Sequence, residues 1–239
     1  MQMDYKRNTR YFTGETMGRL STICWVVAVA CAVLLFLRIW WLYWISGMIG
    51  LAAVICAIVF STRSVSDSEY EGVCNNLDKA FRTRFTDFIN AELNKNNGRG
   101  KAPVSVDEEK IRFSRSFLYD GETLLRVGQD DRRRTGKLSF AAYLTERNRL
   151  FLGYEMHGLV TEAHEEIFGV YLFENIEAIE AFKPEGLSPL AEYSRVSIKL
   201  KGKETPIEFW RANDAELDEL VATVRSRMTV ETEQETAEE

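Results

Sequence analysis

The sequence predicts a two-helix transmembrane hairpin followed by an α+β soluble domain, in which a C-terminal helix caps an antiparallel β-barrel or sandwich. Residues 20–62 are almost wholly apolar, and from residue 110 onward apolar and polar side chains alternate with the period of two that is typical of strands. A final segment has the helical period instead. These patterns divide the chain into an N-terminal segment (1–19), the hairpin (20–62), a stalk helix (63–98), a linker (99–109), the β domain with its helix (110–229) and a disordered acidic tail (230–239).

The predicted hairpin consists of two apolar segments separated by Arg38. At about 1.5 Å per residue, residues 20–37 span about 27 Å and residues 39–60 about 33 Å, so each can cross a hydrocarbon core of about 30 Å. A cleaved secretory signal is the rival interpretation of residues 1–37, but such signals have apolar stretches of only about 7–15 residues. An aromatic cluster follows Arg38 and marks the far membrane interface; it comprises Trp40, Trp41, Tyr43 and Trp44.

Basic residues predict how the hairpin is oriented in a cell membrane. Four of them precede the first span and one follows the second, whereas the turn contains only Arg38; the flanking residues are Lys6, Arg7, Arg10, Arg19 and Arg63. Because basic segments stay on the cytoplasmic side, we expect both termini in the cytoplasm. Neither span contains a charged residue, which argues against a proton relay or an ion pathway built from ionisable side chains.

Each span carries one narrow stripe of small side chains, which allows helix backbones to approach closely in lipid. The first stripe consists of Ser21, Cys24, Ala28 and Cys31, and the second of Ser46, Gly50, Ala53 and Ala57. The two stripes either face each other within one hairpin or join the hairpins of different copies in a homo-oligomer. We expect packing within one hairpin, because it is the simpler arrangement.

A long amphipathic helix is predicted after the hairpin. Apolar residues recur every three or four positions between Tyr70 and Leu93, with charged and polar residues between them. Gly98 and Gly100 supply a stop signal, and the linker follows. We expect this stalk helix to pack on the β domain or on a copy of itself rather than on the membrane surface, because its polar face is not rich in Lys and Arg.

Short antiparallel strands are predicted beyond the linker, separated by turn residues such as Asp120-Gly121 and Lys201-Gly202. Strands that follow one another without intervening helices form a barrel or a sandwich. They are Ile111–Tyr119, Thr123–Gln129, Leu138–Thr145, Arg149–Met156, Glu165–Phe173, Ile176–Phe182, Arg195–Leu200 and Pro206–Trp210. Asn213 or Asp214 caps the closing helix, whose apolar face consists of Leu217, Leu220, Val221, Val224 and Met228.

Three stretches of the β domain carry a family resemblance. They are Asp120–Leu125 (DGETLL), Ala142–Gly153 (AYLTERNRLFLG) and Phe173–Phe182 (FENIEAIEAF). Together they make residues 110–229 similar to the bacterial PH-like (pleckstrin-homology-like) domains, which show a Gly-Glu entry, a Leu-Thr hairpin leading to Arg and an Ile-x-x-Ile strand. The resemblance covers roughly half of the chain. It implies a β-barrel or sandwich closed by one helix, and such domains are often joined to transmembrane helices.

Residues 130–137 (DDRRRTGK) contain the only dense basic cluster of the soluble part. In PH domains that bind inositol phosphates, a basic loop between early strands cradles the phosphates, since Arg and Lys match several anionic oxygens at once. The candidates for lipid headgroup contact, as a phosphate site or as a basic patch on anionic lipid, are Arg132, Arg133, Arg134 and Lys137. The alternative is a solvated hairpin tip whose arginines pair with Asp130 and Asp131.

Composition argues against several functional classes. The chain has 30 basic residues (Lys and Arg) and 36 acidic ones (Asp and Glu). Residues 1–62 contain five of the basic and two of the acidic residues, which leaves 25 basic and 34 acidic residues for the rest of the chain. This acidic balance argues against nucleic-acid binding. Four cysteines without disulfide or metal spacing are typical of a reducing compartment. His157 and His164 lie near several glutamates, but the loop between them favours surface side chains over a metal site.

Nothing in the sequence indicates catalysis. It contains neither a nucleophile motif nor a Gly-rich phosphate loop, so we expect no enzymatic activity, no metal and no cofactor. Phe209 and Trp210 could form a platform on which a ligand stacks, but aromatic side chains beneath a closing helix belong more often to the core.

Three functional hypotheses follow. In the first, a two-pass bacterial membrane protein presents a non-catalytic scaffold or adaptor domain to a protein partner in the cytoplasm, with contact to membrane lipids. In the second, the hairpins assemble into a pore or effector that opens when a ligand binds inside the barrel, which then requires a cavity lined by a few polar groups. A scaffold has an interior filled with side chains instead. The third, an accessory subunit of a stress or transport system, differs from the first only in its partner.

Overall fold

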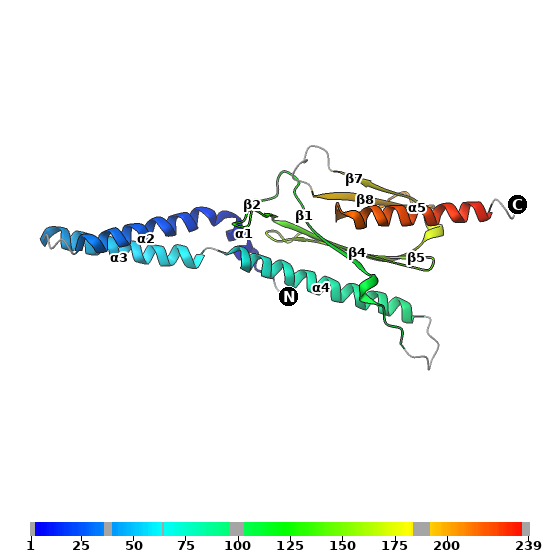
Figure 1. Ribbon diagram of the computed structural model, residues 1–239, viewed down its shortest axis with the longest axis horizontal. Helices are drawn as coiled ribbons and strands as arrows, with labels where there is room; N and C mark the ends of the chain where they lie inside the picture. Colours follow the sequence, from blue (N-terminus) through cyan, green and yellow to red (C-terminus); the bar gives the residue numbers. More distant parts are fainter. Residues whose placement is uncertain (1–2, 36–39, 64, 96–102, 184–191, 236–239) are drawn as a thin grey trace. The chain divides into compact units, whose positions relative to one another are not determined.

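The computed structural model describes residues 3–35, 40–63, 65–95, 103–183 and 192–235. The chain forms two compact units, Met1–Val73 with Gly128–Arg132 and Cys74–Val127 with Arg133–Glu239. The described part of the first unit is helical apart from short connections and the turn Gly128–Arg132, and the second is built on antiparallel sheets (Figure 1). The α+β class expected from the sequence is therefore confirmed.

The first unit contains helices α1 (Tyr5–Thr13), α2 (Glu15–Leu35) and α3 (Trp40–Arg63) and the start of α4 (Asp67–Asn94). Of the described helices, only α3 has an apolar stretch long enough to cross a membrane, Trp44–Ser61, whereas the apolar part of α2, Arg19–Leu34, is shorter. The expected pair of full-length spans is thus supported for one helix only. The difference arises because residues 36–39, which include the end of the first predicted span and the predicted turn at Arg38, lie outside the described residues.

α1 forms in the N-terminal segment, where the sequence indicated no helix. Asp4 caps it by accepting a hydrogen bond from the Arg7 N–H at 3.0 Å. The buried Tyr11 ring stacks on Tyr70 of α4 with 4.1 Å between the ring centroids, and its hydroxyl donates to Asp67 Oδ1 at 2.9 Å. α1 therefore packs on the first turns of α4.

The second unit contains two main sheets, and all their strand pairs are antiparallel, as predicted. The four-stranded sheet has the order β1-β4-β5-β6, with β1 Arg112–Phe117, β4 Lys137–Glu146, β5 Arg149–Gly158 and β6 His164–Leu172. The three-stranded sheet has the order β7-β8-β9, with β7 Ile176–Phe182, β8 Tyr193–Leu200 and β9 Ile207–Ala212. Each of these strands overlaps one predicted from the alternating pattern.

A short two-stranded ribbon completes the strands of this unit. It pairs β2 (Leu125–Val127) with β3 (Arg133–Thr135). The sequence predicted β2 within a longer strand but placed β3 in a basic loop, because Arg133-Arg134-Thr135 has no apolar residue to show a strand pattern.

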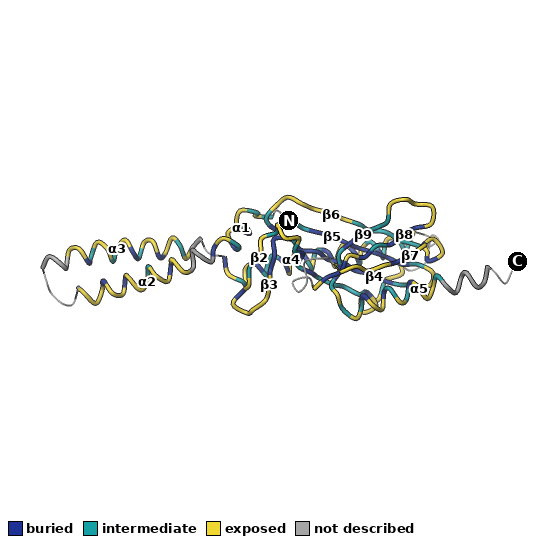
Figure 2. Tube along the Cα trace, turned by 90° about the horizontal axis from the view of Figure 1, so that it is seen from above, coloured by how far each residue is buried: buried dark blue, intermediate teal, exposed yellow. Residues whose placement is uncertain are grey.

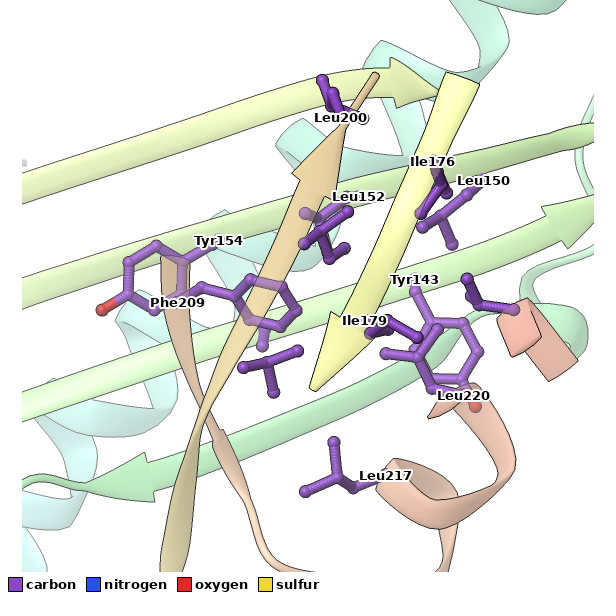
Figure 3. Packing of buried hydrophobic residues seen from close by; sticks show 14 of the residues in the cluster. Tyr143, Leu150, Leu152, Tyr154, Ile176, Ile179, Leu200, Phe209, Leu217 and Leu220 are labelled. Carbon is purple, nitrogen blue, oxygen red and sulfur yellow. The ribbon is translucent and has the colours of Figure 1, made fainter. Parts of the chain in front are cut away.

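The core lies between the two main sheets and the closing helix α5 (Ala215–Glu235). Figure 3 shows Leu150, Leu152 and Tyr154 of β5 directed toward Phe209 of β9 and the other core residues. In the described strands no ladder of hydrogen bonds joins the two main sheets, so the closed-barrel alternative does not form. The chain passes between the sheets through the short helix η2 (Phe173–Asn175) instead of continuing β6 into β7.

α5 begins at a cap that the sequence predicted. The Leu217 N–H donates to Asp214 Oδ1 at 2.9 Å, so Asp214 and not Asn213 supplies the capping side chain. Leu217, Leu220 and Val224 are buried against the core. α5 continues to Glu235, into the residues 230–239 expected to form a disordered tail, because Glu and Gln are good helix formers; residues 236–239 lie outside the described residues.

α4 covers the outer face of the four-stranded sheet from Cys74 onward. Its buried side chains Phe81 and Phe85 pack, together with Phe88, against aromatic rings of the sheet, with centroid distances of 5.6–6.3 Å; the sheet contributes Phe113, Phe140 and Phe168. Of the arrangements considered for the stalk helix, packing on the β domain is the one that forms.

The described part of the expected linker is bound to α4. Asn94 bonds both backbone groups of Val104, accepting from its N–H at 2.8 Å and donating to its carbonyl at 2.7 Å, and Asn90 accepts from the Val106 N–H at 2.8 Å. Residues 96–102, with the predicted glycine stop signal, lie outside the described residues. Residues 104–106 therefore extend the α4 layer and do not act as a free tether.

Candidate functional site

The small-residue stripes of α2 and α3 face each other within one copy of the chain. Ser21 Oγ donates to the Ala57 carbonyl at 3.1 Å, and a Cβ built on Gly50 would lie 3.1 Å from Cys31 Cβ. Six of the eight stripe residues are buried, namely Ser21, Ala28, Cys31, Ser46, Ala53 and Ala57, and the other two, Cys24 and Gly50, are half-buried. The hairpin itself thus uses the surfaces that a homo-oligomer would need.

A cysteine placed at Gly50 tests this arrangement directly. Cβ atoms about 3.5–4.5 Å apart allow a disulfide, so Gly50→Cys should oxidise onto the native Cys31 after a small adjustment. We expect an intrachain crosslink in whole cells, seen as a reducible shift of the monomer band and located by mass spectrometry. Gly47→Cys is the matched control, since nothing lies within 4 Å of its Cβ. A disulfide-linked dimer as the main product of Gly50→Cys would instead place the stripes between two copies.

The outward faces of the same two helices are apolar and exposed. Figure 2 shows exposed residues along both α2 and α3. They include Trp25, Val26, Val29 and Val33 of α2 and Trp44, Ile45, Met48, Leu51, Ile55 and Ile58 of α3. A contiguous apolar surface of this size marks contact with a membrane or with another protein, because water does not solvate it favourably.

The predicted basic cluster does not form one site. Arg132 pairs with Asp130, with 3.8 Å between Nε and Oδ2, as the solvated-tip alternative expected. Arg133 is exposed, but the Arg134 side chain is buried. Only Arg132 and Arg133 remain at the surface among the three arginines.

Lys137 is bound within a turn. Its ammonium group donates to Asp120 Oδ2, and Asp120 Oδ1 also accepts from the Thr123 N–H at 2.9 Å. Partial burial acts to raise the pKa of Asp120, but the hydrogen bonds from Lys137 and Thr123 lower it overall. Lys137 therefore stabilises the turn before β2 through its bond to Asp120.

The most buried charge on the sheet face beneath α4 is Glu155 of β5, whose side chain is fully buried. Arg84 of α4 donates to it through two atoms, Nε to Oε1 at 2.8 Å and a terminal nitrogen to Oε2. His157 Nε2 donates to the same Oε2 at 3.0 Å. A buried carboxylate with a two-point arginine contact is the expected way to keep its charge in a low-dielectric layer.

The electrostatics of Glu155 follow from these partners. Burial acts to raise its pKa, but the hydrogen bonds with His157 and Arg84 outweigh burial and lower the pKa below its ordinary value. Glu155 is therefore charged in the folded protein at neutral pH. Its place within a packed layer favours a structural role, in which it fixes α4 to the sheet, over a catalytic one.

The two histidines, which the sequence favoured as surface side chains, lie side by side. The His157 ring lies against the His164 ring of β6, with 4.7 Å between the centroids and 33° between the ring planes, and His164 Nε2 lies 3.6 Å from Glu166 Oε2. Across the described part of the chain, no three His, Cys, Asp or Glu side chains are placed to hold a metal ion. His157 is mostly buried and bonds to Glu155, whereas the His164 side chain is more exposed than that of His157.

The β sheets end in strands that can accept a further strand. β1 and β6 flank the four-stranded sheet, and β7 and β9 flank the three-stranded one. β6 is exposed or half-buried along all nine residues. Such an edge presents backbone N–H and C=O groups with which an extended peptide segment can pair.

The aromatic pair at the end of β9 belongs to the core. Phe209 is buried, and Trp210 is partly buried against the core and packs edge-on against Tyr193 with 5.5 Å between the ring centroids. The ligand-platform alternative therefore gains no support.

No protein-family model, curated protein or solved structure matches this chain. Its function is therefore inferred from its own residues.

Sequence reasoning missed the Arg84–Glu155 pair, whose members are 71 residues apart. One signal could have indicated it. The continuous apolar run from Leu150 to Leu152 is typical of a strand covered on both faces, and Glu155 follows in the same strand. A carboxylate on a doubly covered strand requires a cationic partner.

Proposed function

We propose that the chain is a membrane-anchored, non-catalytic scaffold in which α2 and α3 cross a cell membrane twice. The observation that carries this proposal is the division of the hairpin surface. Small side chains fill the contact between the helices, and large apolar side chains such as Trp25, Met48 and Ile55 face outward. In lipid the outward face is solvated by acyl chains, and the small residues allow close backbone packing. The basic residues that flank the apolar parts of these helices, Lys6, Arg7, Arg10 and Arg19 on one side and Arg63 at the end of α3, support cytoplasmic termini.

In this proposal the α+β domain is a PH-like adaptor that binds a protein partner. The order of a four-stranded sheet, a three-stranded sheet and a closing helix supports the family resemblance. The space between the sheets is filled by side chains of both sheets and α5, as expected for a scaffold. Partner binding then falls to surfaces, and the exposed edge β6 is the docking surface that we propose.

The alternative of an oligomeric pore gated by a ligand has less support. It needs a surface for joining hairpins and a cavity for the ligand. The small-residue stripes are occupied within the hairpin, and apolar side chains fill the core of the β domain.

A topology experiment tests the membrane part of the proposal. We expect the full-length chain to stay in the membrane fraction after alkaline carbonate extraction. A tag fused to the C-terminus should be cleaved by protease only after the cells are opened. Release by carbonate, or cleavage of the tag in intact cells, would contradict the proposed two-pass anchor.

Capture in native membranes tests the adaptor part. A photoreactive amino acid in place of Leu172, an exposed residue at the end of β6, should crosslink to one protein species. The same amino acid in place of Lys203, an exposed residue in the loop between β8 and β9, is the control and should not capture that species. Equal capture from both positions would argue against β6 as the docking surface.

A further inference from the structure

The β2 strand exposes apolar side chains that no feature of the fold explains. Leu124, Leu125 and Val127 lie within four consecutive residues and are 41%, 37% and 53% exposed. Outside the hairpin, the other exposed large apolar side chains of the described residues are single ones, Val104, Leu172 and Phe182. Single exposed apolar residues are normal, whereas a cluster indicates a contact surface.

The pairing of the ribbon places an arginine beside this cluster. Val127 pairs with Arg133 and Leu125 with Thr135. Directly opposed residues of an antiparallel pair project from the same face, so Leu125, Val127 and the exposed Arg133 share one face. Apolar side chains next to a basic one suit the surface of an anionic bilayer, where acyl chains and phosphates lie within a few ångström of each other.

The turn of the ribbon, Gly128–Arg132, belongs to the same compact unit as the hairpin helices. Within that unit, the Gln129 N–H donates to Asp67 Oδ2 at 2.8 Å. Asp67 follows Arg63, the last residue of α3, by four positions, which span at most about 14 Å. If α3 leaves the bilayer near Arg63, as the proposed function requires, this turn lies close to the membrane surface.

We propose that the β2–β3 ribbon binds the surface of the bilayer that holds the hairpin, with Leu125 and Val127 inserted among the headgroups and Arg133 bound to the phosphates of anionic lipid. This inference rests on the proposed membrane anchor and replaces the basic cluster expected from the sequence. Of that cluster, Arg134 is buried and Lys137 is bound to Asp120, so neither takes part.

Photocrosslinking in lipid nanodiscs tests the inference with the full-length chain. We introduce p-benzoylphenylalanine in place of Val127, whose exposed side chain allows the substitution without repacking. In discs that contain phosphatidylglycerol, we expect lipid adducts at this position to exceed those at Phe182, a matched control that is 49% exposed, by about tenfold. In discs of phosphatidylcholine alone, we expect the adducts at position 127 to fall several-fold, and Arg133→Gln should remove most of this difference.

A third labelling position separates this inference from the proposed anchor. Met48 is 75% exposed on the outward face of α3, and p-benzoylphenylalanine in its place should give lipid adducts in every disc. Adducts at position 48, with adducts at position 127 no more frequent than at position 182, would overturn the ribbon inference alone. Absence of adducts at position 48 would overturn the anchor. Adducts between position 127 and a second polypeptide would show that the ribbon binds protein and would also overturn the inference.

Discussion

Replacing Arg84 by Met is expected to lower the free energy of unfolding of the sheet that contains β5 by about 2 kcal/mol. The substitution keeps most of the aliphatic volume but leaves the fully buried Glu155 carboxylate with His157 as its remaining partner. Breaking a fully buried ion pair costs about 3–5 kcal/mol, and the half-exposed Arg84 side chain reduces this cost through solvent screening. Hydrogen exchange of the β5 amides should accelerate about 30-fold, at tenfold for each 1.4 kcal/mol.

Arg82→Met is the matched control for this experiment. Arg82 lies two positions before Arg84 on α4, and its side chain is 48% exposed, against 49% for Arg84. It pairs with Asp78 at 3.0 Å on the helix surface and lies 4.4 Å from the centre of the Phe113 ring. Exposed contacts of these kinds are worth less than about 1 kcal/mol each. Equal acceleration in both variants would show that Glu155 does not depend on Arg84.

The same network predicts how acid affects stability. The folded pKa of Glu155 lies below its ordinary value of 4.5, because the hydrogen bonds from His157 and Arg84 outweigh burial. Between these two pKa values the unfolded chain binds more protons than the folded chain. The stabilisation that the Glu155 carboxylate provides is therefore complete above pH 4.5 and is lost as the pH falls through the folded pKa.

Glu155→Gln isolates this contribution. The amide has no charge to lose, so the difference in stability between the natural chain and this variant should shrink as pH falls below 4.5. Hydrogen exchange corrected for the intrinsic rate at each pH measures this difference. A difference that stays constant from neutral to acid pH would show that the carboxylate is not the group that titrates.

Local patterns predicted most of the β domain. Alternation predicted all seven described strands of the two main sheets, since each has one face toward a shared core and turn residues at its ends. The Asp214 cap and the apolar face of α5 were also predicted, because both depend on residues close together in the sequence. β3 could not be predicted in this way, because its three residues, Arg, Arg and Thr, show no apolar pattern and pair with β2 through the backbone. The burial of Arg134 in this strand was also unexpected.

Contacts between distant segments were the part that local patterns could not show. The amphipathic stripe of α4 indicated that the helix packs on something, but not that Phe85 rests on β5 or that Arg84 reaches Glu155. The separate surroundings of the basic residues in 130–137 could not be predicted for a related reason. Four basic residues adjacent in sequence have different surroundings once β3 forms, and charge density alone does not reveal which of them a neighbouring carboxylate binds.

Gly153→Ala should destabilise the domain by about 3 kcal/mol, at the upper end of the usual cost of overpacking. Gly153 of β5 faces α4, where an added Cβ would meet the Phe85 ring, lie 2.8 Å from its Cε2 atom and lie 3.1 Å from Phe168 Cε1. Phe85 is completely buried between Phe81 and Phe168, so its ring cannot move aside without displacing its neighbours. We expect faster hydrogen exchange in both α4 and β5, since the clash pushes the helix off the sheet.

A double-mutant cycle identifies the clash as the cause. Phe85→Leu removes the ring atoms that the new Cβ would meet, so Gly153→Ala should cost about 2 kcal/mol less in that background. Gly72→Ala on the same helix is the control of opposite sign. Nothing lies within 4 Å of its Cβ, and Ala is about 1 kcal/mol better than Gly within a helix, so this variant should slow exchange in α4. If Gly153→Ala cost the same with Leu as with Phe at position 85, contact between α4 and β5 at this point could not account for its effect.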